Sequence, residues 1–302
     1  MFATLLSGLP NPDEPGDLDA AIETVIRVQE EAGLEPVTDG RLRPPGSDPV
    51  AAWQFAAGLT TRAVKQSLPG PYSAGWRSRA SSAGAAARRD RTLAAADATR
   101  AYIEALVTAG CPLIEIEEAD AHRIGEDEAE RALFREAHAR LTDGIVGTHL
   151  SLSIVGKAAA TAGVETILAA PYASLAVDLI DGPDNWNLVS RTGGERGIVV
   201  GVVGAGEARE EPREILLWAA HYATSTMGRG RARVGLGSAG DWTPLSWGAA
   251  VRKMQALGAA ARLGDLPPGE ELLESVNPQA VSARHAALGS KASRTPKPRR
   301  TL

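Results

Sequence analysis

Short apolar runs rich in β-branched residues alternate with longer, Ala-rich segments along almost the whole chain. Runs of the first kind predict buried strands, and apolar residues at helical spacing predict amphipathic helices. The predicted strands cover residues 2–7, 35–38, 63–67, 113–117, 144–153, 175–179, 197–203 and 233–236. The clearest predicted helices cover residues 18–32, 89–109, 126–141, 212–225 and 246–263. This alternation predicts a parallel sheet.

Eight successive strand–helix units close most simply into one (β/α)8 domain, a TIM barrel. We assign residues 1–289 to this barrel, and an open doubly wound sheet is the alternative. Functional residues of such a barrel are expected at the carboxyl ends of the strands and in the loops that follow them. Residues 290–302 are polar, basic and contain proline, which predicts a disordered tail.

Composition narrows the classes of protein that fit. The formal net charge of -5 argues against a general nucleic-acid-binding surface, which needs clustered positive charge. The arginines of residues 228–233 are interpreted as a solvated loop. No apolar run approaches the roughly 20 residues that cross a bilayer, and the first ten residues lack a basic leader. We therefore expect a soluble, cytoplasmic protein with no membrane or nucleic-acid partner.

The chain has a single cysteine, Cys111. One cysteine excludes an internal disulfide framework and any site built from two thiolates of the same chain. Cys111 precedes a predicted strand, and we expect it to be a small packed core residue.

The loops at the predicted strand ends, taken in order, resemble the C-terminal catalytic domain of cobalamin-independent methionine synthase, a barrel of the UROD/MetE-like type. The resemblance runs from Phe2 to about Leu263 and depends on the order and spacing of its pieces. These pieces are residues 29–35 leading to Asp39 and Gly40, Lys65 with residues 68–73, residues 114–118, residues 148–151, the strand ending at Asp178, residues 201–203 and residues 238–240.

The resemblance implies transfer of a methyl group from a reduced folate to a thiol held on zinc by a histidine, two cysteines and a glutamate. The family's His-x-Cys pair falls on His149 and Ser151, its glutamate near Asp178, and its second cysteine on Ala239. Serine is a poor zinc ligand at neutral pH and alanine is none. We therefore expect no tight zinc site, and folate is the one cofactor that the resemblance still allows.

Other positions define the expected site. The family's substrate-binding Gly-Glu turn appears here as Gly40-Arg41, which reverses the charge. Of the neighbouring carboxylates Glu117 and Glu118, only one faces inward from a strand, and the resemblance favours Glu118. The expected catalytic residues are His149, Glu118 and Asp178. The expected substrate-binding residues are Arg41, Lys65, Tyr72, Ser73, Trp76, Ser151 and Asp241.

Three functions remain open at this point. The first is a divergent transferase that moves a methyl or other alkyl group to a small thiol or related acceptor without the usual zinc. The second is a barrel lyase or hydrolase that uses His149 as acid or base. The third is a non-catalytic paralogue that binds a metabolite or a partner protein; a homodimer is also compatible with the chain. A barrel of this kind hosts many chemistries, so the fold alone does not separate them.

Overall fold

The computed structural model describes residues 1–13, 16–77, 84–207 and 211–266. Its strands are β1 (Phe2–Thr4), β2 (Lys65–Pro69), β3 (Leu113–Glu117), β4 (His149–Ile154), β5 (Ser174–Asp178), β6 (Gly197–Val203) and β7 (Val234–Ser238). Its α-helices are α1 (Leu18–Ala32), α2 (Pro49–Gly58), α3 (Pro71–Arg77), α4 (Gly84–Ala109), α5 (Glu128–Thr142), α6 (Val164–Ile167), α7 (Trp186–Arg191), α8 (Arg213–Ser225) and α9 (Trp247–Asp265). Short 3-10 turns are η2 (Ala121–Arg123), η3 (Ala160–Ala162), η4 (Pro183–Asn185), η5 (Thr226–Gly228) and η6 (Arg231–Arg233).

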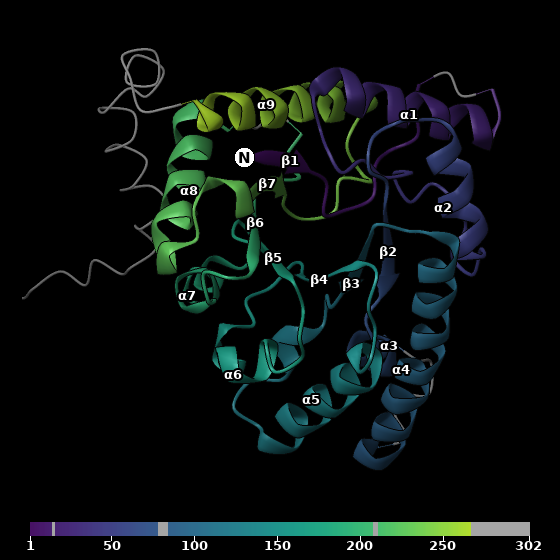
Figure 1. The fold of residues 1–302 in the computed structure, drawn as a ribbon, viewed down its shortest axis with the longest axis vertical. Helices are drawn as coiled ribbons and strands as arrows, with labels where there is room; N and C mark the ends of the chain where they lie inside the picture. Colours follow the sequence, from purple (N-terminus) through teal and green to yellow (C-terminus); the bar gives the residue numbers. More distant parts are fainter. Residues whose placement is uncertain (14–15, 78–83, 208–210, 267–302) are drawn as a thin grey trace, which may run out of the picture.

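In the described residues the strands form one parallel sheet of seven, in the order β1-β7-β6-β5-β4-β3-β2. The sheet curls on itself, and the helices lie around its outer side (Figure 1). This arrangement is consistent with a (β/α)8-type fold, as the sequence predicts. All strands point the same way, so their carboxyl ends open at one end of the curl and their amino ends at the other.

The expected strand at residues 35–38 explains why the sheet does not close. On one side, Val37 forms an isolated bridge with Val64, and its N–H donates to Ala63 O over 2.9 Å. On the other side, Glu35 N donates to Ala3 O over 2.8 Å, but Pro36 has no N–H with which to continue a ladder. The predicted eight-stranded, fully closed barrel is therefore wrong at this seam: the sheet is curled but not fully closed.

Several helix boundaries follow from capping residues. The Asp17 carboxylate accepts a hydrogen bond from Ala20 N over 2.9 Å at the start of α1, as predicted, and Gly33 ends the helix at φ 85°. Ser246 caps α9 in the same way. The sequence analysis missed α2 and α3, whose apolar and small residues carry little helical periodicity, and the short helices α6 and α7.

The start of β4 differs from its prediction. Residues 144–153 look like one extended run, but Gly144 and Gly147 adopt φ values of 70° and 86°. These left-handed conformations are open to glycine and interrupt a strand. β4 consequently begins at His149 and continues to Ile154. His149 thus lies at the amino end of the strand, not at its carboxyl end.

One half of the sheet interior is apolar. Leu6, Ala176 and Val199 form a small cluster there, joined by Phe2 and Val155. Two glycines of β7 make room for it: a Cβ atom on Gly235 would overlap the Phe2 ring, and one on Gly237 would lie 3.0 Å from both Leu6 Cγ and Val199 Cγ1. The glycines of β7 therefore let the side chains of β1 and β6 fill this half.

The other half of the interior is polar. Lys65 of β2 donates a hydrogen bond to Glu115 of β3 over 2.9 Å, and both side chains are at most 2% exposed. Ser67 donates to the other oxygen of Glu115 over 3.3 Å. Burial lowers the pKa of Lys65, while Glu115 opposes the shift. A buried ion pair of this kind specifies which side chains face each other more than it stabilises the fold.

The core outside the sheet is apolar and includes Cys111, as predicted. The Cys111 side chain is 1% exposed, and burial raises the pKa of its thiol to about 11.

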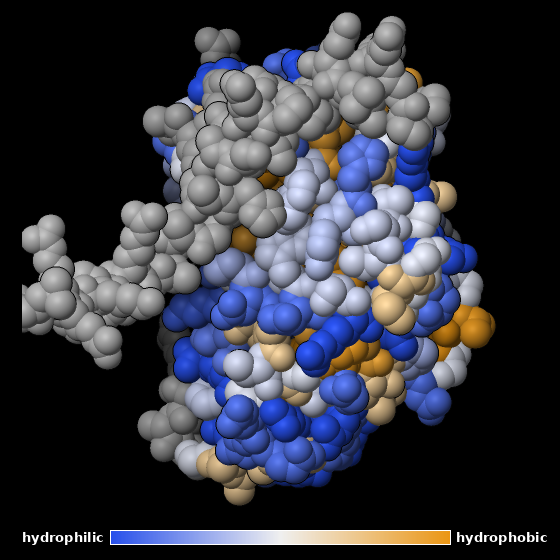
Figure 2. All heavy atoms as spheres, turned by 90° about the vertical axis from the view of Figure 1, so that its left-hand side faces the viewer, coloured by the Kyte–Doolittle hydropathy of each residue, from blue (hydrophilic) through white to orange (hydrophobic). Residues whose placement is uncertain are grey.

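None of the helices among the described residues has the length and apolarity to span a bilayer. The face that Figure 2 shows is mostly polar, with apolar residues in separated groups. The end of the assigned barrel, residues 267–289, and the expected tail, residues 290–302, lie outside the described residues.

We predict that Lys65→Met lowers the free energy of unfolding by roughly 3–5 kcal/mol, because it leaves the Glu115 carboxylate buried without a counter-charge. The double variant Lys65→Met/Glu115→Leu should recover most of the loss, because it buries no charge. Urea denaturation of the three proteins measures both effects. Equal destabilisation of the single and double variants would contradict the importance of the pair.

Candidate functional site

A cavity of about 530 Å³ opens at the carboxyl ends of the strands, and we call it the mouth cavity. The segments after six of the strands and the turn after residues 35–38 contribute to it. Its lining residues are Leu6, Ser7, Gly8, Arg41, Arg77, Glu117, Ala119, His122, Val155, Gly156, Lys157, Asp181, Gly240, Asp241 and Thr243. Functional residues are expected in this position in a (β/α)8-type fold.

The charges around the mouth cavity are separated by sign. The cations Arg77 and Lys157 follow β2 and β4, and His122 follows β3, which lies between these two strands in the sheet. Asp181 and Asp241 follow β5 and β7, farther along the sheet. The strand order therefore places a cationic arc next to an anionic arc around one cavity.

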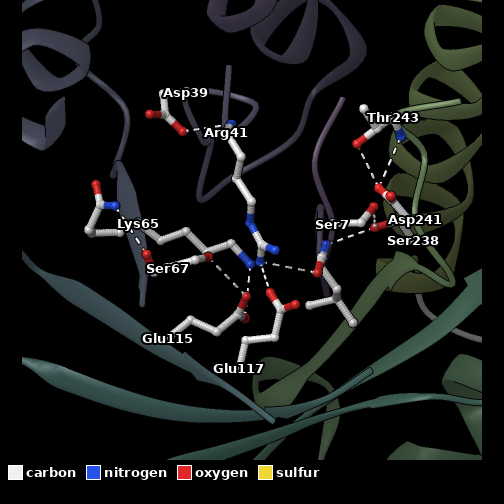
Figure 3. Close-up of polar contacts among 12 residues, drawn as sticks. Ser7, Asp39, Arg41, Lys65, Ser67, Glu115, Glu117, Ser238, Asp241 and Thr243 are labelled. Atoms are coloured by element: carbon white, nitrogen blue, oxygen red, sulfur yellow. Dashed lines mark hydrogen bonds and ion pairs between the residues drawn. The ribbon is translucent and has the colours of Figure 1, made fainter. Parts of the chain in front are cut away.

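Arg41 and Glu117 form an ion pair between the arcs (Figure 3). The Arg41 backbone has φ 57°, and its N–H donates to Asp39 Oδ1 over 2.9 Å. Its guanidinium group also reaches Leu6 O at 3.5 Å. The close-up shows Arg41 and Glu117 beside Lys65 and Glu115, so two ion pairs are adjacent in the polar half of the interior. Arg41 and Asp241, both expected in the site, do line the mouth cavity.

Asp178, one of the expected catalytic residues, is not a free carboxylate facing the cavity, because backbone N–H groups occupy both of its oxygens. It is fully buried at the end of β5. Its Oδ1 accepts from the N–H groups of Ile180 and Asp181, both at 2.9 Å, and its Oδ2 accepts from those of Gly156 at 3.3 Å and Gly240 at 2.7 Å. Burial raises its pKa, and the backbone hydrogen bonds oppose that shift. Asp178 therefore ties together the loops after β4, β5 and β7, with its oxygens already occupied.

The positions that correspond to the family's zinc ligands do not surround one opening. His149 and Ser151 line a separate cavity at the amino ends of the strands, Asp178 is occupied as described, and Ala239 is a buried alanine beyond β7. The placement of His149 beside Asp178 in the mouth is wrong, because β4 begins at His149. Among the described residues, no three His, Cys, Asp or Glu side chains are grouped so that they could hold a metal ion. This donor set does not fit the family's zinc.

Glu118 faces away from the sheet interior, contrary to the prediction from the resemblance. It is fully buried and accepts hydrogen bonds from Tyr72 N at 2.9 Å, Ser73 N at 2.7 Å and Ser73 Oγ at 2.5 Å. His138 Nε2 lies 3.1 Å from it. Since successive strand residues point to opposite faces, Glu117 faces inward instead. Glu118, Tyr72 and Ser73 thus join β3 to α3 behind the sheet.

The remaining two expected residues also lie away from the mouth cavity. Trp76, on α3, contacts the guanidinium groups of Arg88 and Arg123, whose central carbons lie 4.1 and 4.9 Å from the ring centroid. Lys65 lines the amino-end cavity with His149 and Ser151. Neither residue is among those that line the mouth cavity.

Sequence reasoning missed four residues that line the mouth cavity: Arg77, His122, Lys157 and Asp181. A signal for them was present, because each follows the carboxyl end of a strand by eight residues or fewer. His122 Nδ1 lies 3.3 Å from Ala119 O. Partial burial lowers the pKa of His122, and the nearby charges of Lys157 and Arg123 add to that shift.

Comparison with known proteins supports the fold alone. No family model matches the chain, and no curated protein matches its sequence. A solved B12-independent methionine synthase from Shewanella sp. W3-18-1, in complex with selenomethionine, is 15% identical with a TM-score of 0.70, over 86% of this chain and 96% of that one. A putative enzyme of the same kind from Listeria monocytogenes is 13% identical with a TM-score of 0.66, over 87% and 97% of the two chains.

The similarity extends to barrels with other activities. A D-psicose 3-epimerase from Clostridium cellulolyticum H10, solved with D-tagatose, is 14% identical with a TM-score of 0.50 over 87% of this chain and 98% of that one. The resemblance to cobalamin-independent methionine synthase is therefore a relationship at the level of the fold.

We predict that Asp178→Asn lowers the free energy of unfolding by about 2–3 kcal/mol, because the amide group removes an acceptor for two of the four backbone N–H groups. Asp181→Asn is the matched control, since this neighbouring carboxylate is exposed; its effect should stay within about 0.5 kcal/mol. Thermal or urea unfolding measures both. Two equal effects would show that Asp178 does not hold the loops.

The histidine pKa values give a further prediction. The pKa values of His122 and His149 are both lowered below 6.5 by burial. Because these pKa values are lower in the folded protein, the unfolded chain binds protons at a higher pH than the folded protein does. The contribution of these residues to the free energy of unfolding is therefore complete above pH 6.5 and is lost as the pH falls below that value. NMR titration should give both pKa values below 6.5, and His149→Gln should reduce the loss of stability on acidification. A value at or above 6.5 for either ring would contradict its burial.

Proposed function

We propose that this chain binds a small zwitterion of the amino-acid type in the mouth cavity. The observation that carries the proposal is the separation of charge by sign: Lys157 and Arg77 along one part of the rim, Asp181 and Asp241 along the next part. A ligand with a carboxylate and an ammonium group gains from both arcs at once when it lies across the cavity. A ligand with a single charge gains from one arc and is repelled by the other.

The size of the cavity and the fold support the same ligand class. A cavity of about 530 Å³ is in the range of small-molecule sites. The structural neighbour from Shewanella sp. W3-18-1 was solved with selenomethionine, which is a zwitterion of this type. The side chain of the ligand would then contact the ion pair of Arg41 with Glu117.

The reaction that best fits such a ligand is transfer of a methyl or other alkyl group to its thiol without zinc. In this step the S–H proton passes to the imidazole of His122, the sulfur forms a bond to the alkyl carbon, and the donor leaves with the electron pair of the broken bond. His122 lines the mouth cavity, and its lowered pKa keeps it neutral near pH 7, as a base requires. Reduced folate is the donor class to test first. His149 belongs to the other end of the barrel and has no part in this step.

We predict that L-methionine stabilises the protein, and that its analogues lacking either the amino group or the carboxylate bind at least tenfold more weakly. A ligand at 100 times its Kd should add about 2.7 kcal/mol of stability. Isothermal titration calorimetry and thermal shift with L-methionine, 4-(methylthio)butanoate and 3-(methylthio)propylamine measure these differences.

Variants locate the binding. Asp241→Asn and Lys157→Gln each remove charge from one arc and should weaken L-methionine binding, whereas Asp143→Asn, at the exposed end of α5, should not. Equal affinity of the unaltered protein for L-methionine and its two analogues, or no binding of any of the three compounds, would contradict the proposed ligand class. Binding of L-methionine or L-homocysteine without methyl transfer from a folate donor would support the binding function and reject the transfer reaction.

A further inference from the structure

A second cavity, of about 450 Å³, opens at the opposite end of the barrel, and we call it the amino-end cavity. Side chains at the amino ends of the strands line it. Its polar groups are Thr4, Lys65, Glu115, His149, Ser151 and Ser174, with Glu195 and Arg233 also in the lining. No residue lines both this cavity and the mouth cavity. It is therefore separate from the site of the proposed function.

Two side chains of this cavity have the geometry of a nucleophile and its base. His149 is the first residue of β4 and Ser174 the first of β5, and β4 and β5 are paired in the sheet. His149 Nε2 lies 2.8 Å from Ser174 Oγ. This distance is within the range in which an imidazole accepts the proton of an attacking hydroxyl. The partial burial of the ring lowers the pKa of His149, and a neutral ring at pH 7 has the lone pair that this role requires.

The surroundings of the pair define the substrate it would accept. Phe2, Leu113 and Val199 contribute apolar wall. The buried charges of Lys65 and Glu115 neutralise each other at 2.9 Å, so that pair does not require a charged ligand. The other two charged residues of the lining, Glu195 and Arg233, are also of opposite sign, so the lining carries no net charge from these four residues. These features fit an uncharged molecule with a short apolar chain next to its reactive carbon.

We propose that Ser174 and His149 form an acyl-accepting dyad that cleaves small, uncharged carboxylic esters at the amino end of the barrel. Ser174 Oγ attacks the ester carbonyl carbon, and its proton passes to His149 Nε2. The bond from that carbon to the alcohol oxygen breaks, and the alcohol leaves with the proton held by His149. Water then attacks the acyl carbon and loses a proton to His149. The bond from that carbon to Ser174 Oγ breaks, Oγ takes the proton back from His149, and the carboxylic acid leaves.

The test uses p-nitrophenyl acetate and p-nitrophenyl butyrate with the full-length protein. Release of p-nitrophenolate gives the rate, and mass spectrometry of proteolytic fragments locates the acyl group. We expect acylation at Ser174, its loss in Ser174→Ala, and a rate about 100-fold or more lower in His149→Gln. Ser225→Ala is the matched control, because this serine is exposed at the end of α8 and does not line the cavity; the variant should be acylated at Ser174 like the parent chain.

The outcomes separate clearly. The melting temperatures of the variants are measured first. If Ser174→Ala unfolds, Ser174→Thr replaces it. Because Ser174→Thr keeps a hydroxyl group, it should retain a measurable rate of p-nitrophenolate release. Acyl groups found only on lysines, or equal acylation of the parent chain and Ser174→Ala, would overturn the dyad. Failure of zwitterion binding in the mouth cavity leaves this result unaffected, because the two cavities share no lining residue.

Discussion

The two ion pairs inside the curled sheet, Lys65 with Glu115 and Arg41 with Glu117, are the interactions on which the rest of the structure depends. A (β/α)8 interior is usually packed with large branched side chains. Here the glycines of β7 confine the apolar packing to the side of β1 and β6, and charges occupy the side of β2 and β3. The buried charges of Lys65 and Glu115 must remain paired, so β2 is held in one register relative to β3. That register decides which side chains reach each end of the barrel.

The same constraint explains the character of the two ends. At the carboxyl ends, Arg41 and Glu117 satisfy each other, and the loops beyond them present cations after β2 to β4 and carboxylates after β5 and β7. Asp178 fixes three of these loops by accepting four backbone N–H groups, which leaves it unsuited to bind a metal ion. At the amino ends, the Lys65–Glu115 pair lies beside a small cavity with a neutral imidazole.

Much of the fold could be predicted from the sequence, because alternating strand and helix patterns are local. Every strand of the sheet overlaps a predicted strand, and α1 has the predicted boundaries. Pro36 was a signal for the seam, because proline has no N–H for a ladder, but the strand pattern of residues 35–38 led to the prediction of a strand there. The site residues were harder to predict than the strands. Gly144 and Gly147 have positive φ values, so β4 begins only at His149 and this residue lies at its amino end. The outward direction of Glu118 depends on its contacts with Tyr72 and Ser73, which are distant in sequence. The expected roles of these residues remain predictions.

The most direct test of the central claim is a crystal structure of the protein with L-methionine. The account predicts one ligand in the mouth cavity, with its carboxylate toward Lys157 and Arg77, its ammonium group toward Asp181 and Asp241, and Arg41 still paired with Glu117. A ligand bound in the reverse orientation, a ligand located elsewhere, or an Arg41 that leaves Glu117 to bind the carboxylate would contradict it.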